Sequence, residues 1–184
     1  MAETKTQKIA ADEFLAWAMA QPEGQRYELC QGEIVAMAPE RNRHNLTKQR
    51  TWRALDDAVR ARNMACTVLG DGATVIVDEI TAYEPDVTVQ CGAEIDLDAV
   101  TVDYPVILVE VVSPSTGDVD TSQKLEDYFR LPSVRHYLIL RAEAKTVIHH
   151  ARRADGAILT AILKEGELTL DPPGLTVEVA ALFP

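Results

Sequence analysis

One carboxylate interrupts the most apolar stretch of this chain. The run Val-Ile-Leu-Val-Glu-Val-Val extends from residue 106 to residue 112, and Glu110 is its single charged member. A continuous run of branched aliphatic residues predicts a strand that is buried on both faces of a sheet. Leaving an unpaired carboxylate in such a strand costs several kcal/mol. The fold therefore has to bring a compensating charge to Glu110.

Periodic patterns on both sides of this strand, which we place at residues 105–112, predict a mixture of helices and strands. Apolar residues at helical spacing predict helices over residues 10–20, 42–63 and 119–131. A Gln31-Gly32 turn between two alternating stretches predicts a hairpin over residues 27–37. Other segments are expected as strands at 65–69, 73–77, 87–89 and 136–140, a loop at 113–118, an antiparallel meander at 146–167 and a strand or short helix at 175–183. We expect a single domain over residues 1–184, with a flexible N-terminus at residues 1–9.

The composition argues against several classes of protein. No apolar run approaches the roughly 20 residues needed to cross a bilayer, so we expect no membrane contact. Residues 1–8 lack the apolar core of a signal peptide, and a cytoplasmic location is therefore expected. Cys30, Cys66 and Cys91 are odd in number and widely spaced, which argues against a disulfide framework. We expect all three to be small buried residues with free thiols.

The overall charge argues against a nucleic-acid partner, whereas one local segment argues for it. The net charge is -11, and nucleic-acid-binding proteins usually present a basic surface. Basic residues nevertheless gather between positions 41 and 53, namely Arg41, Arg43, His44, Lys48, Arg50 and Arg53. Their simplest interpretation is the solvated face of an amphipathic helix whose apolar stripe comprises Leu46, Trp52, Leu55, Ala58 and Val59. Contact with nucleic acid is the alternative.

Two acids near the central strand could hold a metal ion. Asp86 precedes the strand at 87–89, and its carboxylate can converge with that of Glu110 on one hard cation. A main-chain carbonyl can assist, and Val111 is the candidate for it. A bound Mg²⁺ would neutralise both acids, polarise a phosphodiester and lower the pKa of a bound water.

Lys124 is the natural cationic partner of these acids. It follows on the next predicted helix, where Asp120, Lys124 and Tyr128 share one face. An ammonium there can orient a water or stabilise developing negative charge, and the alternative is a surface Asp-Lys pair. Glu28 and His44 rate low on spacing alone. Residues 149 and 150, both histidines, point to opposite faces of a strand and cannot chelate one metal together.

Taken in order, these motifs resemble those of one family. The motifs are Tyr-Glu-Leu-x-x-Gly-Glu at 27–33, Arg43-His44, Pro85-Asp86, Val109-Glu110-Val111 with Ser-Pro-Ser-Thr at 113–116, and Asp120-x-x-x-Lys124-x-x-x-Tyr128. Their order is similar to that of the Uma-two family of restriction endonuclease-like proteins, assigned to the PD-(D/E)XK nuclease superfamily. The resemblance implies an α/β (α+β) fold with a restriction-endonuclease-like core, in which a mixed β-sheet is flanked by helices and carries additional antiparallel hairpins.

The resemblance also implies a role for each site residue. Asp86 matches the family's metal-binding aspartate, and Glu110 matches the acid of its E-x-K element. Val112 stands where the usual lysine would be, so Lys124 takes that role from the following helix, and Glu28 matches an N-terminal acid that joins the site. The implied cofactor is Mg²⁺, with Mn²⁺ as a substitute. DNA is the implied substrate, and cutting both strands suits a homodimer.

Three functions follow from these patterns. The leading hypothesis is a Mg²⁺-dependent endonuclease that hydrolyses DNA, with Glu28, Asp86, Glu110 and Lys124 as catalytic residues. A second hypothesis keeps the fold as a binding or dimerisation module with weak or no catalysis; the negative charge favours it and the retention of all four residues opposes it. A third, hydrolysis of a small phosphorylated molecule, suits the charge but has no positive support in the sequence.

Overall fold

The centre of the molecule is a six-stranded mixed sheet. The computed structural model describes residues 8–112 and 119–184. The strands lie in the order β10-β9-β8-β7-β6-β3, and only β7 and β8 run parallel. Their bounds are Cys66–Leu69 (β3), Val87–Cys91 (β6), Pro105–Val112 (β7), His136–Arg141 (β8), Thr146–Arg152 (β9) and Ile158–Leu163 (β10). The apolar run around Glu110 is therefore an interior strand, as predicted.

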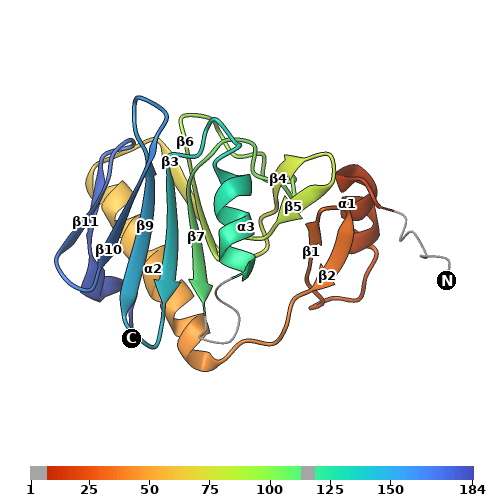
Figure 1. Ribbon diagram of the computed structural model, residues 1–184, viewed down its shortest axis with the longest axis horizontal. Helices are drawn as coiled ribbons and strands as arrows, with labels where there is room; N and C mark the ends of the chain where they lie inside the picture. Colours follow the sequence, from red (N-terminus) through yellow and green to blue (C-terminus); the bar gives the residue numbers. More distant parts are fainter. Residues whose placement is uncertain (1–7, 113–118) are drawn as a thin grey trace.

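Two helices cover opposite faces of this sheet (Figure 1). They are α2, Asn42–Ala61, and α3, Val119–Tyr128. Because side chains alternate along a strand, Val109 of β7 shares a core with Leu55 of α2, whereas Leu108 shares one with Tyr128 of α3. Glu110 lies on the same side of β7 as Leu108 and therefore faces α3. The predicted mixed sheet flanked by helices is confirmed.

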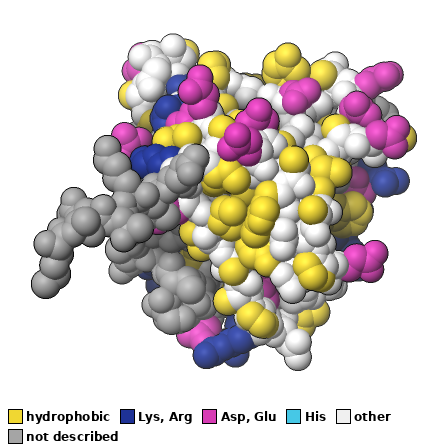
Figure 2. Space-filling view, turned by 90° about the vertical axis from the view of Figure 1, so that its right-hand side faces the viewer, with side chains coloured by type: hydrophobic (Ala, Val, Ile, Leu, Met, Phe, Trp, Pro, Cys, Tyr) yellow, Lys and Arg dark blue, Asp and Glu magenta, His cyan; other side chains and the backbone are white. Residues whose placement is uncertain are grey.

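A smaller antiparallel sheet, ordered β2-β1-β5-β4, lies beyond α3 with α1 packed against it (Figure 1). The bounds are Ala11–Met19 (α1), Tyr27–Cys30 (β1), Glu33–Ala36 (β2), Val75–Asp78 (β4) and Thr81–Tyr83 (β5). Gln31 and Gly32 both have positive φ, 55° and 85°, as a tight hairpin turn requires, so the predicted hairpin is confirmed. Figure 2 shows this end of the molecule, where apolar side chains gather at the middle of the face and acidic ones around it.

The C-terminal segment packs on α2. A separate hairpin pairs β11, Glu167–Leu170, with β12, Leu175–Glu178, and a 3-10 helix follows at Val179–Leu182 (η1). Both β12 and η1 contact α2, and their apolar residues join the core on that face of the large sheet. The expected strand or short helix therefore becomes both in turn.

Two of the three cysteines form a disulfide, so the expectation of three free thiols is wrong. The register of β3 against β6 places Cys66 opposite Cys91, with Cα atoms 4.0 Å apart. The number and spacing of cysteines carry no information on the register of two strands that are separated by other elements along the chain, so this pairing could not be predicted from them. Cys30 in β1 takes no part in this disulfide.

The polar side of α2 also departs from the expected pattern. Leu46 and Trp52, assigned to the apolar stripe, are 46% and 36% exposed, whereas Lys48, assigned to the solvated face, is only 3% exposed. Arg50 and Arg53 are exposed as expected. The N-terminal half of α2 thus turns a charged residue inward, and its partners are carboxylates of the site described below.

Two expected flexible or loop segments lie wholly or partly outside the residues that the structure describes. The loop at 113–118 lies outside the described residues, and so do residues 1–7 of the expected flexible N-terminus. Ile9 is held, because its N–H donates to the carbonyl oxygen of Gly32. The helix expected at 119–131 ends at Tyr128. Across the ranges that the structure covers, none of the helices combines the length and apolar character that a membrane span requires.

Candidate functional site

The four predicted catalytic residues line one cleft of about 780 Å³. The cleft lies between the small sheet, the first turn of α2, the end of β7 and α3. The residues reach it from four different segments: Glu28 from β1, Asp86 from the approach to β6, Glu110 from β7 and Lys124 from α3. Their catalytic roles stay a prediction. That prediction requires the four side chains to meet in one place, and in the structure they line the same cleft.

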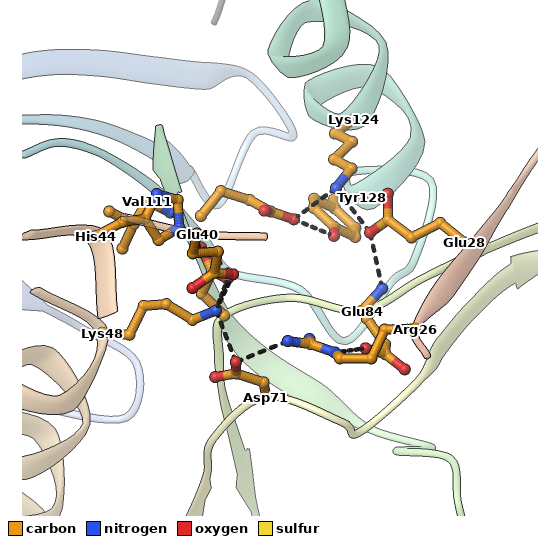
Figure 3. Close-up of polar contacts among 12 residues, drawn as sticks. Arg26, Glu28, Glu40, His44, Lys48, Asp71, Glu84, Val111, Lys124 and Tyr128 are labelled. Atoms are coloured by element: carbon orange, nitrogen blue, oxygen red, sulfur yellow. Dashed lines mark hydrogen bonds and ion pairs between the residues drawn. The ribbon is translucent and has the colours of Figure 1, made fainter. Parts of the chain in front are cut away.

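Lys124 reaches back from α3 to the buried acid of β7. Its Nζ lies 2.9 Å from Oε1 of Glu28 and 3.1 Å from Oε1 of Glu110 (Figure 3). The Tyr128 hydroxyl donates to the same Glu110 oxygen at 2.8 Å. All four residues are at least nine-tenths buried. Lys124 is therefore not the lysine of a surface pair, and Tyr128, whose contribution the sequence left open, contacts the site directly.

Burial dominates the electrostatics of Glu110. It raises the pKa of Glu110 to about 8; the Lys124 ammonium opposes the shift, while the nearby Asp86 and Glu28 carboxylates add to it. Both hydrogen bonds that Glu110 makes with described residues converge on Oε1. Oε2 is then the atom that can face a ligand in the cleft. A divalent cation bound there would favour the ionised form that burial disfavours.

Asp86 has the opposite electrostatic character. Its Oδ2 accepts the Val111 N–H at 2.6 Å and lies 3.4 Å from Nε2 of His44, and its Oδ1 lies 2.8 Å from Nζ of Lys48. Burial alone would raise the pKa of Asp86, but His44, Lys48 and the Val111 N–H outweigh it and hold the pKa below its usual range. Two neighbouring carboxyl groups with pKa values pushed apart are typical of catalytic sites.

Lys48 gathers three acids around its ammonium. Nζ lies 2.6 Å from Glu40, 2.6 Å from Asp71 and 2.8 Å from Asp86 (Figure 3). Burial would lower the pKa of Lys48, but these carboxylates raise it well above its usual range. The ammonium therefore stays charged although its side chain is almost fully buried.

Arg26 connects the Lys48 cluster to the Lys124 cluster. Its guanidinium pairs with Asp71 at 2.8 Å and with Glu84 at 2.6 Å. The main-chain N–H of Glu84 in turn donates to Oε1 of Glu28 at 3.0 Å, which is the oxygen that contacts Lys124. A continuous polar network thus runs from the Lys48 cluster to the Lys124 cluster, and the small sheet supplies its middle.

The donor set of the cleft fits a hard divalent cation. Three buried carboxylates, those of Glu28, Asp86 and Glu110, line it, and oxygen ligands of this kind are what Mg²⁺ prefers. Among the described residues, Glu40, His44 and Asp86 form a group whose donor atoms lie within 4.8 Å of one another. Asp86 belongs to both groups of residues.

Sequence reasoning missed most of the Lys48 cluster. His44 and Lys48 are four residues apart on α2, which places them on one helical face and was a readable signal, and Glu40 lies in the chain just before the helix. The neighbouring arginines suggested that this whole helical face is exposed to solvent, so the signal was not recognised. Asp71 sits between two glycines in a loop, and nothing in its local sequence indicates that it meets α2.

The remaining histidines belong to the core. His149 contacts His136, with 2.9 Å between Nε2 and Nδ1, whereas His150 contacts the Thr160 hydroxyl at 2.8 Å. Burial lowers the pKa of His149 to about 4, with smaller effects from the other two histidines. The expectation that His149 and His150 do not chelate one ion together agrees with these separate partners.

Comparisons with known proteins give a consistent picture. A family model described as "Putative restriction endonuclease" matches residues 11–182. An uncharacterized protein from Synechocystis is 25% identical over 186 residues, which cover 96% of this chain and 92% of that protein. The crystal structure of a "putative nuclease belonging to DUF820" from Anabaena variabilis superposes with a TM-score of 0.75 and 14% identity, covering 95% of this chain and 97% of that one. At this identity the superposition shows that the two proteins share a fold.

Proposed function

This chain belongs to the Uma2 family, and on that premise we propose that it is a metal-dependent endonuclease that hydrolyses DNA phosphodiester bonds. The observation that carries the proposal is the meeting of Glu28, Asp86, Glu110 and Lys124 in one buried cleft. A cluster of three carboxylates with one ammonium has no structural advantage in a core, because each buried charge costs desolvation energy. Such a cluster is expected where a cation and a phosphate bind.

Each residue of the cleft has a distinct part in this proposal. Asp86 and Glu110 would hold a Mg²⁺ or Mn²⁺ ion, together with the main-chain carbonyl of Val111. When bound, the ion supplies the charge that polarises the scissile phosphate. Lys124 would orient the attacking water or stabilise the negative charge that develops on the phosphate. Glu28 holds the Lys124 ammonium in place through its 2.9 Å contact.

DNA would approach at the open side of the cleft. Arg41 and Arg43 line it and are exposed, and the Arg43 side chain is 57% accessible despite its 3.2 Å pair with Glu143. Exposed guanidinium groups are suited to bidentate phosphate contacts. The small-sheet end in Figure 2 presents apolar side chains at its middle, with acidic and some basic ones around them. The net charge of -11 is thus compatible with local binding at the cleft.

The wild-type protein tests the proposal directly. We expect nicking or linearisation of supercoiled plasmid DNA with Mg²⁺ or Mn²⁺ and no cleavage with EDTA, measured on agarose gels. DNA binding without cleavage under any metal condition would favour the binding-module alternative. Hydrolysis of p-nitrophenyl phosphate without DNA cleavage would favour the small-substrate alternative. Either result would contradict the endonuclease proposal.

The active form is proposed to be a homodimer, and the edge strand β10 offers a self-complementary surface. β10 carries no charge, and Ile158, Leu159 and Ile162 are 39%, 53% and 69% exposed. Arg153 N–H donates to the carbonyl of Ala157, so the alternate residues 158, 160 and 162 direct their main-chain groups away from β9. These residues read Ile-Thr-Ile, which allows two copies to pair antiparallel about Thr160.

Ile162→Lys is expected to convert the dimer into a monomer, because it places an ammonium on each side of the pair. The dissociation constant should rise at least about tenfold, the equivalent of 1.4 kcal/mol. Size-exclusion chromatography with light scattering measures the mass. Ile76→Lys, at a 38% exposed residue on β4, serves as the matched control and should remain dimeric. A monomeric wild type would contradict this assignment without affecting the proposed chemistry.

A further inference from the structure

The Lys48 ammonium lies where a metal ion would lie. Three carboxylates from three segments approach it within 2.6–2.8 Å: Glu40 from the chain before α2, Asp71 from the loop after β3, and Asp86 from the approach to β6. An ammonium group has three N–H donors, so it can donate one hydrogen bond to each of the three carboxylates. Three carboxylate groups therefore surround a single positive charge.

The surroundings of Lys48 show that this cation is built into the fold. The lysine side chain is 3% exposed, and the residues flanking its stem on α2, Thr47 and Thr51, are fully buried. His44 lies one turn before it on α2 and brings Nε2 to 3.9 Å from Glu40 and 3.4 Å from Asp86. If the ammonium were removed, the His44 imidazole and the Glu40, Asp71 and Asp86 carboxylates would surround an empty position.

Asp86 is shared between this position and the cleft. Its Oδ1 contacts Lys48, while its Oδ2 contacts the Val111 N–H beside Glu110. In two-metal hydrolytic sites, a pair of cations flanks the reacting group about 4 Å apart. Here the Lys48 ammonium is a fixed positive charge beside Oδ1 of Asp86. Because this ammonium is part of the chain, dilution or a chelator cannot remove it.

We propose that Lys48 stands in for a second metal ion, so that the protein binds one divalent cation in the cleft and keeps a latent second site filled by its own ammonium. Lys48 is a positioning residue: it neutralises Asp86 and fixes the direction of Oδ2. The cleft ion rests on the proposed function, whereas the latent site rests on the Lys48 contacts alone. Once vacated, the latent site would take a cation that accepts both carboxylate and imidazole ligands, and Mn²⁺ is such an ion.

Lys48→Met tests the proposal, because it keeps the apolar stem and removes the ammonium. We expect the variant to bind one more Mn²⁺ per chain than the wild type, counted by isothermal titration calorimetry and by electron paramagnetic resonance of free Mn²⁺. We also expect the variant to unfold at a lower temperature than the wild type in EDTA, and Mn²⁺ to restore its melting temperature. Adding Glu40→Gln to Lys48→Met should remove the extra ion.

Two control variants and the wild type separate the possible outcomes. Lys48→Arg keeps a cation, and Lys145→Met changes an exposed lysine; both should bind as many ions as the wild type. An equal ion count in Lys48→Met and wild type would overturn the proposal, and so would failure of Lys48→Met to fold with Mn²⁺ present. If the wild type binds no ion and Lys48→Met binds one, the latent site holds and the metal-dependent function fails.

Discussion

Glu110→Gln is expected to reduce DNA cleavage by roughly a thousandfold or more while leaving the fold intact. The amide is nearly isosteric with the carboxylate, and its oxygen can still accept from Lys124 and Tyr128, both within 3.1 Å of the native Oε1. It cannot carry the negative charge that a divalent cation requires. Plasmid cleavage rates give the loss of activity, and calorimetric titration with Mn²⁺ should show weakened binding.

The stability of this variant separates a functional role from a structural one. Burial already disfavours the charged form of Glu110, so replacing it by a neutral amide should change the free energy of unfolding by no more than about 1 kcal/mol in urea. Glu143→Gln is the matched control, since Glu143 lines the same cleft and its ion pair is with Arg43. Equal cleavage by Glu110→Gln and wild type would exclude Glu110 from the chemistry.

Lys124→Met is expected to lower kcat by about 10²- to 10⁴-fold, the range for groups that assist proton transfer or stabilise transition-state charge. Metal affinity should be retained or increased, because the variant loses a cation that competes for Glu28 and Glu110. The opposite effects on turnover and metal binding distinguish Lys124 from a metal ligand. Single-turnover cleavage and Mn²⁺ titration measure the two quantities.

The same variant should be less stable without metal. Removing one partner of a buried ion pair typically costs about 3–5 kcal/mol, because the other charge remains buried. Protonation of Glu110 can relieve part of this cost, so we expect a loss near 3 kcal/mol in EDTA that Mg²⁺ partly restores. Lys164→Met, at an exposed lysine, should change neither stability nor turnover. Full activity in Lys124→Met would remove the lysine from the proposed mechanism.

The small sheet has a direct part in the site. β1 supplies Glu28, and the preceding Arg26 pairs with both Glu84, whose N–H donates to Glu28, and Asp71, which contacts Lys48. Packing of Phe14 on Leu29 and Ala82 fixes β1 against β5 and so places Glu28 near Lys124. The N-terminal helix and hairpin therefore contribute to the geometry of a site whose acids lie mostly on the large sheet.

Local patterns in the sequence were sufficient for most of the elements and for part of the site, although they missed β5 and the pairing of β11 with β12. The apolar run around Glu110 identified an interior strand, and Gln31-Gly32 identified a hairpin, because side-chain periodicity and turn geometry are properties of neighbouring residues. The order of motifs then selected Asp86 and Lys124. The cleft contains both, with Lys124 held between Glu28 and Glu110.

Only the tertiary structure determined which residues pair with one another. It joined Cys66 to Cys91 through a strand register and turned Lys48 from an expected solvated face into a cluster of three acids. It also separated the electrostatic characters of Asp86 and Glu110, which look alike in the sequence. The physical reason is the same in each case: helical and strand periodicity report burial along one element, whereas charge pairing and pKa depend on groups that distant segments bring within a few ångströms.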